Sequence, residues 1–291
     1  MHTIEVTRRQ LGTPILVSVV AEDRARAEAA IERAFAECER IERAYSRFSE
    51  GNELAALNAQ VGQWAEVSEE LYKLIEFGER VKARTDGAFD LSVKSILEGW
   101  GYDAAYSLQE ATPGRVGALE LDGTRVKLST PIELGGLGKG YAIDRMDGAL
   151  ANFANVHINA GGDIRVRGVD SAGAPWRLVF EHPTDTSQAI GYVDTSDLAL
   201  ACSSPSRRRW RNRHHLVDPR TAQPADGMLA VYTQSSSALL ADAYSTALFV
   251  LGYEKARDLV PELPVEAMLV SPQGKLFRSS GFKGKLFTEP A

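Results

Sequence analysis

Apolar and polar residues recur along the first third of the chain in patterns that predict one strand followed by helices. Residues 11–21 are rich in β-branched side chains and predict a strand, whereas residues 22–45 predict a long amphipathic helix. Further helices are expected over 53–58 and after Ser68, a good N-cap residue. The apolar stripe of the long helix consists of Ile31, Ala34, Phe35, Cys38, Ile41 and Tyr45.

Short strands dominate the rest of the chain. Residues 118–121 and 125–128 flank Asp122-Gly123, which is a strong sequence signal for a hairpin. Helices are expected over 141–153 and 242–251. Other strands are expected over 156–159, 164–168, 176–180, 190–193, 198–202 and 229–233, with a closing hairpin over 265–271 and 275–278. Interleaved helices and hairpin-linked strands predict an α+β fold, with a mixed or largely antiparallel sheet flanked by helices.

Composition and charge narrow the classes of protein. The chain has 291 residues, of which 44% are hydrophobic, and its net charge is −6. No linker or repeat divides it, so one large domain over residues 1–291 is expected. The acidic balance gives no general attraction for nucleic acid or anionic lipid. Cys38 lies on an apolar helical face and predicts a reduced core thiol rather than a disulfide.

The first twenty residues lack the pattern of a signal peptide, and no apolar run approaches the ~18 residues of a membrane span. The sequence as it stands therefore predicts a cytoplasmic protein without a membrane span. A periplasmic or membrane-anchored protein is the alternative if a leader has been removed.

The most distinctive segment is the glycine-rich stretch over residues 132–144. Gly135, Gly136, Gly138 and Gly140 let the backbone approach a ligand closely, and Lys139 adds a positive charge. A helix is expected directly afterwards, so a phosphate could lie at its N-terminus. A tight strand-to-helix connection explains the same residues, because the spacing matches neither phosphate-binding fingerprint.

Two other motifs combine chemically useful side chains. Asp242 and Thr246 lie four residues apart on an expected helix, so they share a face and offer the hard oxygen ligands that Mg²⁺ prefers. The competing interpretation, favoured by spacing alone, is that Asp242 caps the helix. His214 and His215 precede an Asp-Pro turn, and either could act as a general base or form structural hydrogen bonds. The cysteines and the scattered histidines do not favour a zinc site.

An arginine-rich stretch over residues 206–213 surrounds Trp210. It could contact phosphate groups, but in an acidic chain a solvated loop is the expected structure.

Taken together and in order, these segments resemble the FAD:protein FMN transferase family (ApbE family) from residue 11 to about residue 252. The closing hairpin lies beyond the resemblance. The matching segments are Gly12-Thr13, Ser46-Arg-Phe48, Glu53-Leu54, Leu57-Asn58, Thr85-Asp-Gly-Ala-Phe-Asp90, Trp100-Gly101, Leu134-Gly-Gly-Leu-Gly-Lys-Gly140 with Asp144, Asn159-Ala-Gly-Gly-Asp-Ile-Arg165, His215-Leu-Val-Asp-Pro-Arg-Thr221 and Ala241-Asp-Ala-Tyr-Ser-Thr-Ala-Leu-Phe249.

The resemblance implies a Mg²⁺-dependent transfer of FMN from FAD to a Ser or Thr hydroxyl of an acceptor flavoprotein, through a phosphoester bond and with release of AMP. It implies that Asp242, Thr246 and the backbone carbonyl of Gly138 hold the metal, and that His215 deprotonates the acceptor hydroxyl. The positions it implies for binding the flavin nucleotide are Phe48, Asp86, Glu133, Gly136, Lys139, Asp163 and Asp218.

Three departures from the family pattern are visible. Glu133 stands where the family usually has Asp, and Gly138 stands where it usually has Ala. A backbone carbonyl ligand survives the second change. Cys202-Ser-Ser-Pro205 and the arginine-rich stretch replace a flexible polar turn, which bears on recognition of the acceptor protein.

Two other functions are compatible with the same residues. One is a FAD pyrophosphatase that hydrolyses FAD to FMN and AMP, and the other is a non-catalytic protein that binds FAD. A mere binder has no need of both the Asp242/Thr246 pair and His215, so the sequence favours an enzyme.

Overall fold

A computed structural model describes residues 1–103, 107–109, 112, 114–206, 209–211 and 213–287. Its centre is an eight-stranded sheet with the order β1-β2-β6-β7-β10-β15-β16-β17, in which every neighbouring pair is antiparallel. The strands are β1 (His2–Gln10), β2 (Thr13–Ala21), β6 (Val156–Ala160), β7 (Asp163–Arg167), β10 (Asp197–Ser203), β15 (Ala230–Ser235), β16 (Glu266–Val270) and β17 (Leu276–Arg278).

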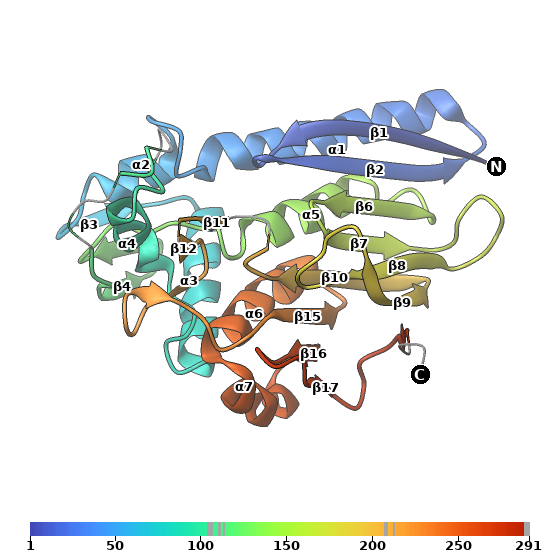
Figure 1. The fold of residues 1–291 in the computed structure, drawn as a ribbon. Helices are drawn as coiled ribbons and strands as arrows, with labels where there is room; N and C mark the ends of the chain where they lie inside the picture. Colours follow the sequence, from blue (N-terminus) through green and yellow to red (C-terminus); the bar gives the residue numbers. More distant parts are fainter. Residues whose placement is uncertain (104–106, 110–111, 113, 207–208, 212, 288–291) are drawn as a thin grey trace.

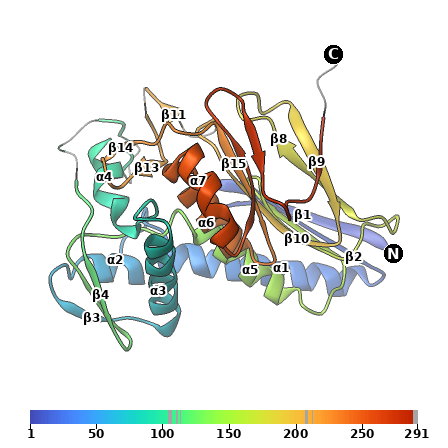
Figure 2. The same ribbon diagram turned by 90° about the horizontal axis from the view of Figure 1, so that it is seen from below.

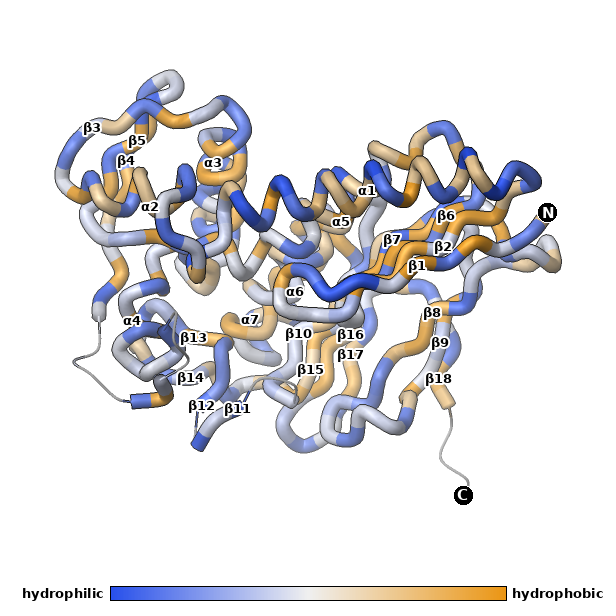
Figure 3. Tube along the Cα trace, turned by 90° about the horizontal axis from the view of Figure 1, so that it is seen from above, coloured by the Kyte–Doolittle hydropathy of each residue, from blue (hydrophilic) through white to orange (hydrophobic). Residues whose placement is uncertain are grey.

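Helices cover one face of this sheet, as Figures 1 and 2 show for α1, α5 and α6. Side chains alternate between the two faces of a strand, and Ile15, Val17 and Val19 of β2 are fully buried against the helical layer. The long helix α1 alternates polar and apolar positions along its length (Figure 3). The helices are α1 (Arg24–Tyr45), α2 (Glu53–Asn58), α3 (Glu69–Arg84), α4 (Lys94–Gly99), α5 (Gly138–Ala149), α6 (Ala238–Leu251) and α7 (Tyr253–Leu259).

Part of the opposite face is covered by a small second sheet with the order β18-β9-β8. Its strands are β8 (Trp176–Glu181), β9 (Ala189–Thr195) and β18 (Lys285–Leu286). Leu178 and Phe180 of β8 pack onto Leu200 of β10, which forms a separate apolar layer on this side. The sheet β3-β5-β4 lies at the end of the molecule and comprises β3 (Trp64–Glu66), β4 (Leu119–Asp122) and β5 (Arg125–Leu128).

The expected α+β class and the largely antiparallel sheet are confirmed. The amphipathic helix, the N-cap at Ser68 and the hairpin around Asp122-Gly123 all form as predicted. The sequence analysis missed β1, β3, α4, α7 and β18. The strand β1 lies at the edge of the sheet, so only Ile4 is buried and the alternation of apolar residues is weak.

The arginine-rich stretch lies partly outside the described residues, which leave out 207–208 and 212. Within it, β11 (Arg209–Trp210) pairs with β12 (Arg213–His214), so part of the expected loop is a short hairpin. The strand β13 (Val217–Asp218) then pairs with β14 (Gln223–Pro224). Across the described ranges, no helix combines the length and apolar character needed to cross a bilayer.

One carboxylate joins three helices of the covering layer. Glu70 of α3 accepts two hydrogen bonds from Arg40 of α1, each 2.7 Å long, and further bonds from the hydroxyl groups of Tyr45 and Tyr141. The bonds from Arg40 outweigh partial burial and lower the pKa of Glu70 to about 2.

We therefore expect Glu70→Gln to destabilise the protein at neutral pH by about 1–2 kcal/mol, after allowance for solvent screening. A lowered pKa in the folded state gives stability that is complete above the ordinary value of 4.5 and is lost as the pH falls toward 2. Urea unfolding at pH 7 and pH 3 should show the difference between variant and wild type shrinking at the lower pH. Glu39→Gln, which removes an exposed carboxylate, is the matched control. An equal difference at both pH values would contradict the prediction.

Candidate active site

Where α5 meets α6, each helix supplies a carboxylate that accepts hydrogen bonds from the first turn of the other, a contact we call the carboxylate exchange. Asp144 of α5 accepts hydrogen bonds from the backbone N–H groups of Ala238 and Leu239, at 2.7 and 3.0 Å, in the first turn of α6. In return, Asp242 of α6 accepts a bond of 2.8 Å from the N–H of Gly140, in the first turn of α5. Each carboxylate thus satisfies orphan donors at the positive end of the other helix.

This exchange corrects two expectations. The helix α5 begins at Gly138 rather than at Tyr141, so the glycine-rich segment supplies its first turn. The helix α6 begins at Ala238 after the N-cap Ser237, so Asp242 lies one turn inside the helix and does not cap it. It meets the N-terminal turn of a different helix, a contact that local spacing does not reveal.

A buried charge cluster surrounds the same point. The ammonium group of Lys139 forms an ion pair with Asp163, the first residue of β7, and lies 3.4 Å from Oδ1 of Asp242. Asp242 is only 3% exposed, and burial raises the pKa of its carboxyl group, an effect that the charge of Lys139 opposes. Two buried carboxylates against one ammonium leave an excess of negative charge, which favours a further cation.

Hydroxyl groups lie next to this cluster. Ser203, the last residue of β10, has its Oγ atom 2.8 Å from Oγ of Ser245 and 3.4 Å from Oγ1 of Thr246. The side chains of Asp242 and Thr246 are one helical turn apart on α6 and both line the cleft described next. Their oxygen donors, together with a carbonyl group, match the ligands that Mg²⁺ prefers. The donor set therefore fits this metal, although the described residues contain no group of three or more His, Cys, Asp or Glu side chains that could hold one.

A large cleft with a volume of about 1320 Å³ runs past these groups. Nine of the eleven predicted site residues line it: Phe48, Glu133, Gly136, Gly138, Lys139, Asp163, His215, Asp242 and Thr246. Asp86 and Asp218 are not in the lining. Asp86 lies in the turn after α3 with a φ of 50°, and Asp218 is held by two hydrogen bonds from the Arg220 side chain. Both lie within two residues of chain segments that do line the cleft.

Aromatic rings line another part of the cleft. The guanidinium group of Arg47 lies 4.3 Å from the ring centre of Phe48 and 4.5 Å from that of Tyr102. Tyr102 in turn stacks on Trp210, with ring centres 5.0 Å apart. Arg47 also lies 3.8 Å from the carboxylate of Glu133. The sequence analysis did not select Arg47 or Tyr102, although Arg47 stands inside the Ser46-Arg-Phe48 motif, and it noted Trp210 only as part of the arginine-rich stretch.

The two adjacent histidines have different surroundings. His214 is buried, its ring meets the edge of Phe249, and burial lowers its pKa. His214 is therefore a structural residue. His215 lines the cleft, next to Leu216 and Val217. Of the two histidines, only His215 lines the cleft, where a general base could reach a ligand.

These features define a class of protein: an α+β fold in which a helix pair and one end of an antiparallel sheet border a large cleft lined by charged residues. The sequence profile described as the ApbE family matches residues 11–269. The chain belongs to the ApbE family.

Individual relatives agree with this assignment. A FAD:protein FMN transferase from Rhodobacter capsulatus is 31% identical over 80% of this chain. The match covers about half (49%) of that protein's own length. A FAD:protein FMN transferase from Klebsiella pneumoniae is 27% identical over 93% of this chain and over 85% of that protein's length.

Among solved structures, the ApbE protein from Thermotoga maritima superposes with a TM-score of 0.87 at 30% identity, covering 96% of this chain and 97% of that chain. The flavin transferase ApbE from Vibrio cholerae has a TM-score of 0.82 at 22% identity, over 97% and 98% of the two chains, and supports the fold.

The helix crossing predicts different effects of substitution at two nearby glycines of α5. A Cβ atom on Gly140 would overlap the carbonyl of Ala238 and lie 2.7 Å from Cβ of Asp242, whereas one on Gly138 would meet nothing within 4 Å. We expect Gly140→Ala to destabilise the protein by about 1–3 kcal/mol, the usual cost of overpacking. Gly138→Ala should leave stability unchanged or slightly raised. Thermal unfolding of the two variants checks this, and equal melting temperatures would contradict it.

Proposed function

We propose that this protein transfers FMN from FAD to a Ser or Thr hydroxyl of an acceptor flavoprotein, forming a phosphoester bond and releasing AMP. Membership of the ApbE family supports the class of reaction. The observation that carries the proposal for this chain is the convergence of Lys139, Asp163 and Asp242, from α5, β7 and α6, in one cleft. His215 and Thr246 line the same cleft.

The cleft offers matching chemistry for each part of FAD. Its volume of about 1320 Å³ exceeds the roughly 300–1,000 Å³ of ordinary small-molecule sites, as an elongated dinucleotide requires. The rings of Phe48 and Tyr102 suit stacking against a planar heterocycle. Lys139 suits the anionic pyrophosphate as a positive point charge. Glu133 and Gly136 also line the cleft, and we include them in the proposed FAD site.

Asp86 and Asp218 are proposed to act through the backbone. Asp218 accepts hydrogen bonds from the backbone and side chain of Arg220 and so fixes the turn whose Val217 and Pro219 line the cleft. Asp86 occupies the turn that leads to Ala88 and Phe89, which also line it. Both are positioning residues in this proposal.

Asp242, Thr246 and the carbonyl of Gly138 are proposed to hold Mg²⁺. When bound, Mg²⁺ would neutralise phosphate charge and polarise the reacting phosphoryl group. The chain itself contributes a buried carboxylate that stays in place because Gly140 donates to its Oδ2 atom. Lys139 offsets part of the remaining negative charge.

The proposed reaction forms one phosphorus–oxygen bond and breaks another. The acceptor hydroxyl oxygen attacks the phosphorus of the FMN half, and the bond between this phosphorus and the bridging oxygen breaks, so that AMP leaves. The proton of the hydroxyl moves to the ring of His215, which acts as general base. A hydroxyl group is a weak nucleophile, so removal of its proton is required for attack.

Flavinylation of an acceptor domain, followed as a fluorescent protein band, tests the proposal. The assay contains FAD, Mg²⁺ and a flavin-free domain with a Ser or Thr flavinylation site. We expect a fluorescent band with the wild type and none after chelation of Mg²⁺. With Asp242→Ala we expect the flavinylation rate to fall by about 100-fold or more. No band with the wild type, or an undiminished one with Asp242→Ala, would refute it. AMP release that needs no acceptor would indicate a FAD pyrophosphatase instead.

The role of His215 has its own test. We expect His215→Asn to lower kcat by about 10²–10⁴-fold, because a general base is lost, while the affinity for FAD stays unchanged. His2→Asn, an exposed histidine at the start of β1, is the matched control. Stopped-time flavinylation assays and FAD titration measure the two quantities. A variant that keeps full kcat would assign the proton transfer to another group.

A further inference from the structure

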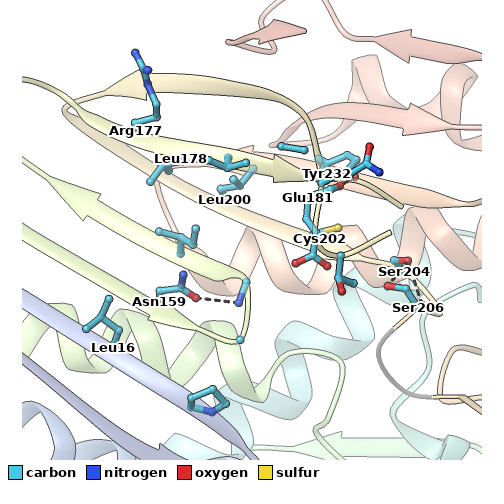
Figure 4. Close-up of a pocket in the computed structure, with 18 of the residues that line it drawn as sticks. Leu16, Asn159, Arg177, Leu178, Glu181, Leu200, Cys202, Ser204, Ser206 and Tyr232 are labelled. Atoms are coloured by element: carbon cyan, nitrogen blue, oxygen red, sulfur yellow. Dashed lines mark hydrogen bonds between the residues drawn. The ribbon is translucent and has the colours of Figure 1, made fainter. Parts of the chain in front are cut away.

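A second groove lies on the face of the main sheet that the helices leave open. Its volume is about 630 Å³. Four residues in one cross-strand row form its floor, because Leu16 pairs with Asn159, Asn159 with Ile164, and Ile164 with Leu200. Figure 4 shows Leu16 and Asn159 on the neighbouring strands β2 and β6, and Leu200 further across the floor on β10. None of these four residues lines the cleft described above.

The wall of the groove is the edge of a strand. Arg177, Leu178 and Val179 are consecutive residues of β8, and all three line the groove. Side chains of consecutive strand residues point to opposite faces, so a groove that touches all three must run along the edge of β8. Among the described residues, β8 pairs with β9 on one side and with no strand on the other.

The groove leads into the candidate active site. Five residues line both hollows: Gly161, Thr186, Cys202, Ser204 and Ser206. At this junction the backbone N–H of Cys202 donates to Asp163, the partner of Lys139. The edge strand runs toward the same point, because the carbonyl of Glu181 at its far end accepts a hydrogen bond from Tyr232, which pairs with Cys202. Figure 4 shows Arg177 far from this junction and Glu181 close to it.

We propose that an extended segment of the acceptor protein, next to its Ser or Thr, binds in this groove as an added strand along the edge of β8. This inference rests on the proposed function, because it supplies the acceptor site for that reaction. From residue 177 to residue 181 the edge measures about 13 Å at ~3.3 Å per residue, which is room for four or five residues of acceptor. Main-chain hydrogen bonds to β8 give affinity, and the floor selects alternate side chains.

The geometry favours a peptide over the adenosine half of FAD. A strand edge offers a row of backbone donors and acceptors at the spacing of another peptide chain, and the floor supplies an apolar contact through the partly exposed Leu16. The groove meets the cleft beside Asp163, so a segment bound there would present its hydroxyl group to the Lys139 and Asp242 cluster. The FAD-sized cleft itself remains available for the nucleotide.

Photo-cross-linking tests the docking without requiring transfer. A benzophenone amino acid replaces Val179, which is 50% exposed on the edge strand, or Thr3 on β1 as the control. The probe is the flavin-free acceptor domain used in the flavinylation assay, irradiated with each variant in the absence of FAD. We expect an adduct from position 179 whose cross-linked peptide contains or adjoins the acceptor Ser or Thr, and none from position 3. No adduct from position 179, or one elsewhere on the acceptor, would overturn the proposal.

Filling the groove gives a second, kinetic readout. Leu16→Trp places a large ring on the floor, whereas Thr3→Trp makes the same kind of change on the same open face, outside the groove. We expect Leu16→Trp to raise the KM for the acceptor at least 10-fold while the FAD affinity stays unchanged, and Thr3→Trp to alter neither.

The possible failures are distinguishable. An unchanged acceptor KM with Leu16→Trp would overturn the docking proposal and leave the transferase intact. A loss of FAD affinity in Leu16→Trp would instead assign the groove to the nucleotide, and this result would also overturn the docking proposal. An adduct from the benzophenone variant at position 179, together with no fluorescent band from the wild type, would refute the transfer reaction and support the docking site.

Discussion

The exchange of carboxylates between α5 and α6 is the constraint on which the candidate site depends. A helix N-terminus has unsatisfied N–H donors, and burying two of them at a crossing is costly unless acceptors are supplied. Asp144 and Asp242 supply those acceptors to each other's helices. Because Asp242 is held in this way, its second oxygen is left facing Lys139 at the bottom of the cleft. The same contact requires a glycine at position 140, since a side chain there would overlap α6.

The charge balance of the site follows from this burial. Burial destabilises the charged form of the Asp242 carboxylate, and the neighbouring Asp163 adds a second negative charge. Lys139 compensates for only one of them. In the proposed function an anionic substrate enters this cluster, and the excess negative charge is the physical argument for the divalent cation that we propose there. The overall acidity of the chain makes this local compensation more important.

The main sheet serves two purposes at once. Its helical face carries the core and fixes α5 and α6, whereas its other face is covered only in part by the small sheet of β8, β9 and β18. The incomplete cover leaves a groove beside an edge of β8 that no strand among the described residues pairs with, and this groove meets the cleft at Cys202. The proposed reaction has a small-molecule donor and a protein acceptor, and in our proposal the cleft takes the first and the groove takes the second.

The sequence by itself determined the α+β class, the long helix α1 and the N-cap at Ser68, because hydrophobic period, capping and turn chemistry are local properties. The order of its motifs also indicated the family that it resembles. It also placed Asp242 and Thr246 on one helical face. Only the tertiary structure decided that Asp242 meets a different helix, that His214 is buried while His215 lines the cleft, and that Trp210 stacks on Tyr102. These outcomes join residues far apart in the chain, and local periodicity carries no information about which distant surfaces pack together.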